Sequence, residues 1–176
     1  MRKLLFFTLF ATAFLACTDK EGTLRGRLAA LDKEFGGANV TDKKKAEEFI
    51  IAAEQLASLV KEKDPNEYVN LLLKAAGLAK TIENPMKAIE LYSKIADGMP
   101  QHPKAPTALF MLGFVYENDL GDLTKAKSIY ESFLQKYPND PDFADDAENA
   151  LKMLGKSPED IIKSFEQQNR DSLQAN

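Results

Sequence analysis

The stretch Pro106–Pro138, PTALFMLGFVYENDLGDLTKAKSIYESFLQKYP, has the pattern of two amphipathic helices joined by a short polar turn. Leu109, Leu112 and Tyr116 recur at three- and four-residue spacing, which places them on one stripe of the first helix. Pro138 cannot extend a helix interior, so it ends the second helix. The stretch therefore predicts a closed pair of helices.

The second helix of this pair has its own stripe of Ala126, Tyr130 and Phe133. Gly113 and Ala126 are small, and two helices approach closely only where the side chains at their crossing are small. Tyr130 and Phe133 then fill the space beside the crossing. Residues 117–122 contain the polar and glycine residues that end one helix and turn the chain.

This alternation of large and small side chains resembles the tetratricopeptide repeat (TPR), a pair of antiparallel helices. The residues that carry the resemblance are Leu109, Leu112, Gly113, Tyr116, Ala126, Tyr130, Phe133 and Pro138. The resemblance implies an all-α fold, in which a short right-handed superhelix of helix pairs forms an α-solenoid.

The same pattern occurs 38 residues earlier, where Ala88, Tyr92 and Pro100 correspond to Ala126, Tyr130 and Pro138. A partial third copy begins at Ala147, and an N-terminal helical segment is a divergent copy. One repeat cannot bury its apolar faces alone, so repetition at a fixed period favours a stacked array. The predicted segments are a signal peptide 1–16, a lipidated cysteine and polar tether 17–23, a divergent repeat 24–63, repeats 64–105 and 106–140, a partial repeat 141–168 and a frayed tail 169–176.

The N-terminus has the pattern of an export signal. Arg2 and Lys3 precede an apolar run over Leu4–Ala16, which is too short for a permanent membrane span of about 20 residues. Cys17, the single cysteine, follows directly, and the four residues ending in it resemble the lipobox of bacterial lipoproteins. We expect Cys17 to be lipidated; ordinary cleavage or a tethered N-terminus is the alternative.

Charge excludes one class of partner. Removal of residues 1–16 takes away two of 23 basic residues and none of 27 acidic ones, so the net charge changes from −4 to −6. Nucleic acid is therefore not an expected partner.

The sequence lacks the residues of common catalytic and cofactor sites. His102 is the single histidine, so a histidine-based triad or metal site has no partners, and we expect a solvated turn residue. An acidic cluster at 140–148 lacks the glycine of a calcium-binding loop, and acids before a helix are favoured by its dipole. No P-loop follows Gly36-Gly37. We predict no enzyme, metal or cofactor.

In the TPR family the first helices of successive repeats line a concave groove that binds protein segments. Transferred by register, the groove positions are Asn70, Leu73, Lys80, Thr107, Phe110, Phe114 and Glu117. Leu73, Phe110 and Phe114 are apolar at positions that the repeat pair does not need for its own packing. The alternative is that the N-terminal segment or the C-terminal helix covers them.

An acylated cysteine followed by helical repeats is similar in arrangement to the lipoproteins of outer-membrane β-barrel assembly and other periplasmic repeat lipoproteins. The resemblance implies a protein-binding adaptor, lipid-anchored at a bacterial outer membrane on its periplasmic side or at the cell surface. Two alternatives remain: a lipoprotein that captures a small ligand or glycan for uptake, and a purely structural spacer.

Overall fold

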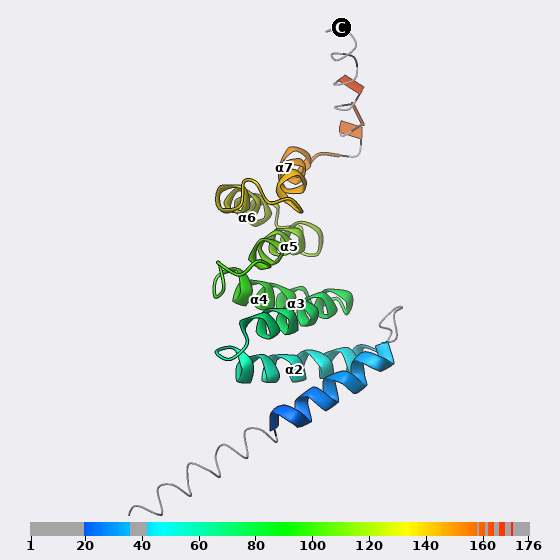
Figure 1. Ribbon diagram of the computed structural model, residues 1–176. Helices are drawn as coiled ribbons and strands as arrows, with labels where there is room; N and C mark the ends of the chain where they lie inside the picture. The colour runs from blue at the N-terminus through cyan, green and yellow to red at the C-terminus, as the bar shows by residue number, and fades with distance from the viewer. Residues whose placement is uncertain are drawn as a thin grey trace, which may run out of the picture. The chain divides into compact units, whose positions relative to one another are not determined.

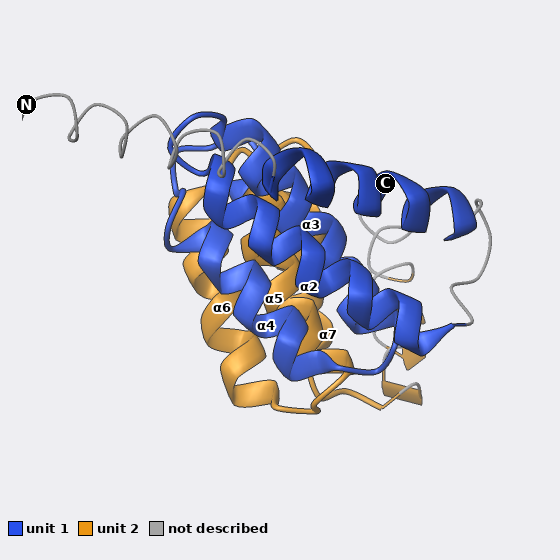
Figure 2. Cartoon of the chain, turned by 90° about the horizontal axis from the view of Figure 1, so that it is seen from below, with its two compact units in different colours: residues 1–105 blue, residues 106–176 orange. Residues whose placement is uncertain are grey.

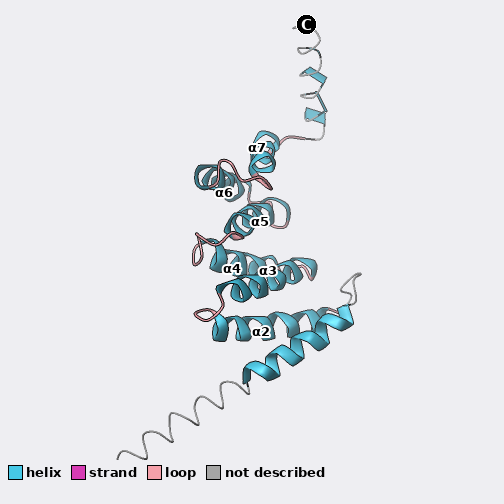
Figure 3. Cartoon of the chain, viewed as in Figure 1, coloured by secondary structure: helices cyan, strands magenta, loops and turns pink. Residues whose placement is uncertain are grey.

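The computed structural model describes residues 20–35 and 42–157, together with 159–160, 162–163, 166–167 and 170. In this part of the chain the regular structure is helical, without a strand, and the helices are joined by turns (Figures 1 and 3). The helices are residues 20–35, here named the first helix, then α2 (Lys43–Val60), α3 (Pro65–Thr81), α4 (Pro85–Ala96), α5 (Ala105–Asn118), α6 (Leu123–Lys136) and α7 (Ala144–Met153). The predicted all-α class of TPR-like helix pairs is confirmed.

The chain forms two compact units (Figure 2). Unit 1 ends at Ala105 and contains the first helix and α2 to α4, whereas unit 2 starts at Pro106 and contains the rest of α5 with α6 and α7. None of the described helices combines the length and the apolar character needed to cross a membrane.

Several helices begin with the same capping device. A side-chain oxygen accepts a hydrogen bond from the backbone N–H three residues further on, which satisfies one of the free donors of the first turn. The capping residues are Asp42, Asp64, Asn84 and Asp122, with donor–acceptor distances of 3.1, 2.9, 3.2 and 3.0 Å. Asp42 is thus the N-cap of α2, directly before its first helical residue Lys43.

Small side chains allow close packing in unit 1. The α3 helix contacts both α2 and α4, and its Ala75, Ala76 and Ala79 are completely buried. The first helix buries three leucines spaced along one face, Leu24, Leu28 and Leu31, and its last residue, Phe35, lies 5.8 Å from the ring of Phe49 in α2.

The first helix lies parallel to α3 in a fixed register. Three ion pairs, Glu21–Lys63, Arg25–Glu67 and Asp32–Lys74, join residues that are each 42 positions apart. Because both partners advance along the chain together, the two segments run in the same direction. This is the relation between the first helices of two successive helix pairs.

The first helix begins at residue 20, earlier than the sequence predicts. Residues 20–23, expected in the polar tether, are helical. The physical reason is that Glu21 accepts hydrogen bonds from Arg25 in the next turn and from Lys63 before α3. Residues 17–19 of the expected tether lie outside the described residues.

In unit 2 the predicted close crossing of α5 and α6 is confirmed. A Cβ placed on Gly113 would lie 2.7 Å from Cε1 of Tyr130, and Tyr130 is completely buried. Ala126 and Phe133 on the same face of α6 are also completely buried, and α6 packs in turn against α7. Further along the chain, Ser157 Oγ accepts a hydrogen bond from the Asp160 N–H at 3.2 Å, which is the geometry of a helix cap.

We expect Gly113→Ala to lower the stability of unit 2. The added methyl overlaps a ring that cannot move away, and such overpacking costs about 1–3 kcal/mol. Gly77→Ala in α3 is the matched control, because its Cβ meets nothing within 4 Å and the helix gains up to about 1 kcal/mol of propensity. Urea denaturation followed by circular dichroism measures both changes, and a stabilised Gly113→Ala would contradict the crossing.

Candidate functional site: a pocket in unit 1

A pocket of about 370 Å³ lies in unit 1, with walls from the first helix, α2, α3 and the cap of α3. Its lining residues are Leu28, Ala29, Asp32, Phe49, Asp64, Asn66, Glu67, Asn70, Leu71 and Lys74. Four of them provide apolar surface, and the others provide three carboxylates, two amides and one ammonium group. The lining therefore combines an apolar wall with a net negative charge.

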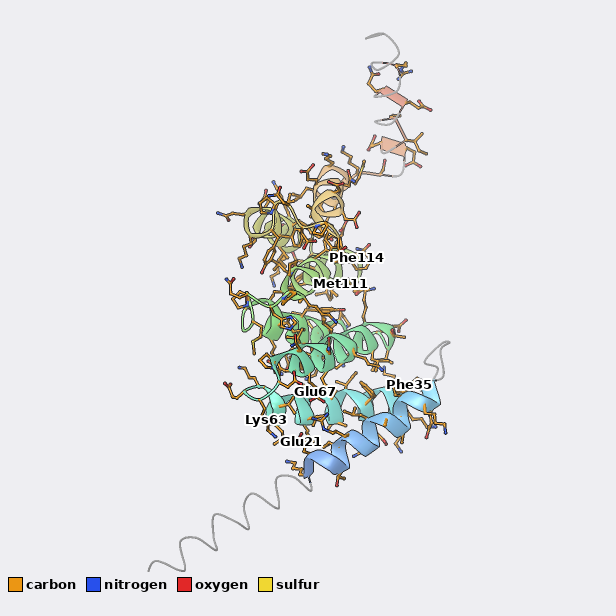
Figure 4. All side chains as sticks on the ribbon, in the orientation of Figure 1. Glu21, Phe35, Lys63, Glu67, Met111 and Phe114 are labelled. Atoms are coloured by element: carbon orange, nitrogen blue, oxygen red, sulfur yellow. The ribbon has the colours of Figure 1, made fainter. Side chains whose placement is uncertain are left out.

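Ion pairs hold the first helix beside α3 along this pocket. Arg25 donates from Nη2 to Glu67 Oε2 at 2.7 Å and to Glu21 Oε1 at 2.9 Å, while Glu21 also accepts from Lys63. Figure 4 shows Glu21, Lys63 and Glu67 close together where the first helix meets the start of α3. The Lys63 ammonium and then the Arg25 guanidinium lower the pKa of Glu21, and the two carboxylates raise the pKa of Arg25.

Lys74 provides the one ammonium group of the pocket lining. It forms an ion pair with Asp32 of the first helix, and its Nζ lies 5.2 Å from the ring centroid of Phe49. A carboxylate on one side and an aromatic face on the other both favour a cation. The positive charge of Lys74 is thus balanced by the Asp32 carboxylate within the pocket lining.

The connection after α4 returns to the rim of the pocket. Lys104 N–H donates to Nδ1 of His102 at 3.1 Å, so Nε2 of His102 is the nitrogen that donates to Asn66 Oδ1, at 3.0 Å. Lys104 Nζ donates to Asn70 Oδ1 at 2.6 Å. His102 was expected to be a solvated turn residue. It is half-buried, and its hydrogen bond to Asn66 links the connection after α4 to α3.

The predicted groove positions of α3 only partly coincide with this pocket. Asn70 lines it, whereas Leu73 and Lys80 are half-buried and are not among its lining residues. The lining stripe consists of Asn66, Glu67, Asn70, Leu71 and Lys74, so it is turned around α3 toward the first helix. The binding role of Leu73 and Lys80 stays a prediction.

Phe110 packs inside unit 2, so the expectation that the repeat pair does not need it is wrong. Its exposed fraction is 9%, and its ring stacks on Phe143 with centroids 4.6 Å apart and an interplanar angle of 21°. Its ring centroid also lies 5.6 Å from Tyr130 and 6.1 Å from Phe133. The physical reason is that Phe143, at the start of α7, closes over the helix pair.

The other predicted positions of unit 2 are half-buried. Glu117 accepts a hydrogen bond from the Tyr130 hydroxyl at 2.8 Å, and burial together with this carboxylate raises the pKa of Tyr130. Thr107 lies in the first turn of α5, and Phe114 lies further along α5 (Figure 4). Their part in binding a partner stays a prediction.

Two further candidates from the sequence are Cys17 and the acidic cluster at 140–148. Cys17, the predicted lipidation site, lies outside the described residues. In the acidic cluster, Asp140 Oδ1 accepts backbone hydrogen bonds from Asp142 and Phe143 at 3.1 and 2.9 Å, which is a turn-capping role. Within the described ranges, no group of three or more His, Cys, Asp or Glu side chains is placed to hold a metal ion.

Sequence reasoning missed the pocket itself and the network around it. The signal that was available is the constant 42-residue spacing between opposite charges of the first helix and the segment 63–74. Opposite charges repeated at one long spacing indicate two helices in parallel register.

Comparison with known proteins supports the repeat. The family model described as tetratricopeptide repeat matches residues 107–140, which span α5 and α6 and lie in unit 2. No curated protein and no solved structure matches the chain. Residues 107–140 are thus a TPR-type helix pair in a chain whose described regular structure is helical, and repeats of this type generally serve as interaction modules rather than catalysts.

We expect Phe110→Ala to destabilise unit 2 by about 3–5 kcal/mol, because it leaves a cavity among three aromatic rings. Hydrogen exchange measured on peptides would show faster exchange over α5 and α6 and little change over α2 to α4. Phe114→Ala is the comparison variant. The Phe114 ring is half-buried, so its removal should lower the free energy of unfolding by less. Equal decreases in the free energy of unfolding for the two variants would contradict a core role particular to Phe110.

We also expect acidification to loosen the first helix. The pKa of Glu21 is lowered from 4.5, so the folded state binds fewer protons than the unfolded state as pH falls. Its stabilisation is complete above about pH 4.5 and is lost as pH falls through the folded pKa. Amide exchange of residues 20–35 between pH 6 and pH 3, corrected for intrinsic rates, measures this. Glu21→Gln should reduce the pH dependence, whereas Glu47→Gln on α2 should not; equal responses would refute the assignment.

Proposed function

We propose that the protein is a non-enzymatic scaffold that binds segments of partner proteins, and that unit 1 supplies a binding pocket for them. The observation that carries this proposal is the pocket that the first helix, α2 and α3 line, in which apolar side chains and hydrogen-bonding groups occur together. The TPR match at 107–140 supports it, because repeats of this type present such surfaces to protein ligands.

We further propose that the protein is lipid-anchored at the bacterial outer membrane through Cys17, on the periplasmic side or at the cell surface. The basic start, the 13-residue apolar run Leu4–Ala16 and the cysteine directly after it support this. Acyl chains attach a protein to a membrane surface without a spanning helix. An acidic chain needs such an anchor, since its charge is not attractive to anionic lipids.

A second candidate is capture of a small ligand or glycan. The pocket volume of about 370 Å³ falls in the range of small-molecule sites, which is about 300–1,000 Å³. The absence of Trp from the sequence removes the strongest stacking surface for sugars.

Site-specific crosslinking in intact cells tests the main proposal. A photoreactive residue in place of Ala29, which is exposed and lines the pocket, should give a crosslink to a defined protein, identified by mass spectrometry. The control places the same residue at Ala30, which is exposed but outside the pocket lining. A bound glycan without any protein crosslink would favour the second candidate, and identical patterns from both positions would refute the pocket as the binding surface.

A further inference from the structure

We infer that the face of α2 and α3 beneath the first helix is an exchangeable docking surface for an amphipathic helix of a partner protein. In the structure the first helix, residues 20–35, occupies this surface, and a partner helix of the same pattern would replace it. The inference goes beyond the proposed function, because this ligand takes the place of the first helix instead of binding beside it.

The first helix buries few apolar side chains for its length. Over residues 20–35 the buried side chains are Leu24, Leu28 and Leu31, whereas α2 and α3, which are of similar length, bury eight and seven residues. Burial of apolar surface is the main source of stability for a packed helix. The first helix is therefore bound less tightly than the two helices that it covers.

The ion pairs of the first helix add little to its stability. Lys63 and Lys74 pair with its acids and Arg25 is its paired base, and these side chains are 56, 44 and 45% exposed. Ion pairs at such exposure contribute little, because water and salt screen them. They set the register of a helix on α3, and another helix with the same charges would satisfy them equally.

Two glycines weaken the first helix without serving its packing. A Cβ placed on Gly22 or Gly26 would meet nothing within 4 Å among the described residues, and both positions are helical. Neither a close approach nor a turn therefore requires glycine here. Each glycine lowers the helix–coil equilibrium about fivefold relative to alanine. A segment that is weak as a helix is easier to replace.

The docking surface has support of its own. The α3 helix contacts both α2 and α4, and these contacts do not involve residues 20–35. Ala75, Ala76 and Ala79 of α3 are completely buried. The three helices α2, α3 and α4 therefore remain a packed group on which one amphipathic helix can be exchanged for another.

The first helix leaves part of this surface unfilled. The pocket of about 370 Å³ lies where Leu28, Ala29 and Asp32 face α2 and α3. Phe49 of α2 and Leu71 of α3 provide apolar surface across from them. A helix with a larger apolar side chain at the position of Ala29 would bury more of this surface and gain free energy.

These contacts define the chemistry of the partner helix. It has the leucine row of the first helix, with spacings of four and then three residues. Its charges follow the order acid, base, acid, so that they pair with Lys63, Glu67 and Lys74. A large apolar residue stands at the position of Ala29. An amphipathic helix in a groove is a common mode of protein recognition.

A fluorescent synthetic peptide of residues 20–35, added to the full chain, tests the inference by fluorescence anisotropy. Because the peptide and the first helix compete for one surface, the same substitution has opposite effects in the two molecules. Leu24→Ala in the chain should raise the affinity for the peptide about tenfold or more, and Leu24→Ala in the peptide should lower it. Circular dichroism of the chain variant should show that the other helices stay folded.

Gly26→Ala gives the reverse pair. In the chain it strengthens the first helix and should lower the affinity for the peptide about fivefold, whereas in the peptide it should raise the affinity about fivefold. Ser128→Ala on the exposed face of α6 is the control, because it raises helix propensity in unit 2 and should leave peptide binding unchanged.

Two peptide variants locate the unfilled space. Ala29→Leu should raise the affinity about fivefold, because the added side chain enters the pocket. Ala30→Leu adds the same side chain at an exposed position outside the pocket lining and should leave the affinity unchanged.

Three results would overturn the inference. They are no binding of the peptide to the Leu24→Ala chain at about millimolar concentration, effects of one sign in the chain and the peptide, and equal effects of Ala29→Leu and Ala30→Leu. None of these results bears on the proposed function, because the crosslink from position 29 tests a ligand that binds beside the first helix.

Discussion

A small side chain stands where neighbouring helices cross, and the packing of each unit depends on it. At Gly113 even one methyl group would overlap the buried ring of Tyr130, and in unit 1 the completely buried Ala75, Ala76 and Ala79 bring α3 against its neighbours. Close approach buries more apolar surface per residue, and it compensates for the limited apolar area of short helices. Large rings such as Phe133 can then fill the remaining space without polar groups being trapped among them.

The helix pairs could be predicted from the sequence, because their packing residues recur at three- and four-residue spacing along each helix. Caps, prolines and the spacing of Ala126, Tyr130 and Phe133 fix where helices start, end and turn. Coverage of Phe110 from the C-terminal side was one of the alternatives left open by the sequence, but Phe143 could not be named as the covering residue, because that contact depends on how the turn before α7 folds. A ring at a surface position of one helix pair becomes a core residue when the next segment closes over it.

The pocket was harder to predict for a related reason. The repeat register identified α3 and Asn70, but the side of α3 that opens to solvent is decided by the first helix, whose charges pair with Glu67 and Lys74. Ion pairs between exposed residues do not affect the spacing of apolar residues, from which helices and their buried faces are predicted. The connection containing His102 likewise acquires its role only after folding, when it returns to Asn66.

The side-chain bonds that join helices within the units link residues from 13 to 42 positions apart, from Tyr130–Glu117 to Arg25–Glu67. Contacts between residues this close in the sequence cost little loop-closure entropy, and chains built from them fold rapidly. Within a unit, helices that have already packed together can then serve as a template for the next segment. The first helix is held to α3 largely by exposed ion pairs and one row of leucines, so it can detach by local unfolding while the remaining pairs stay folded.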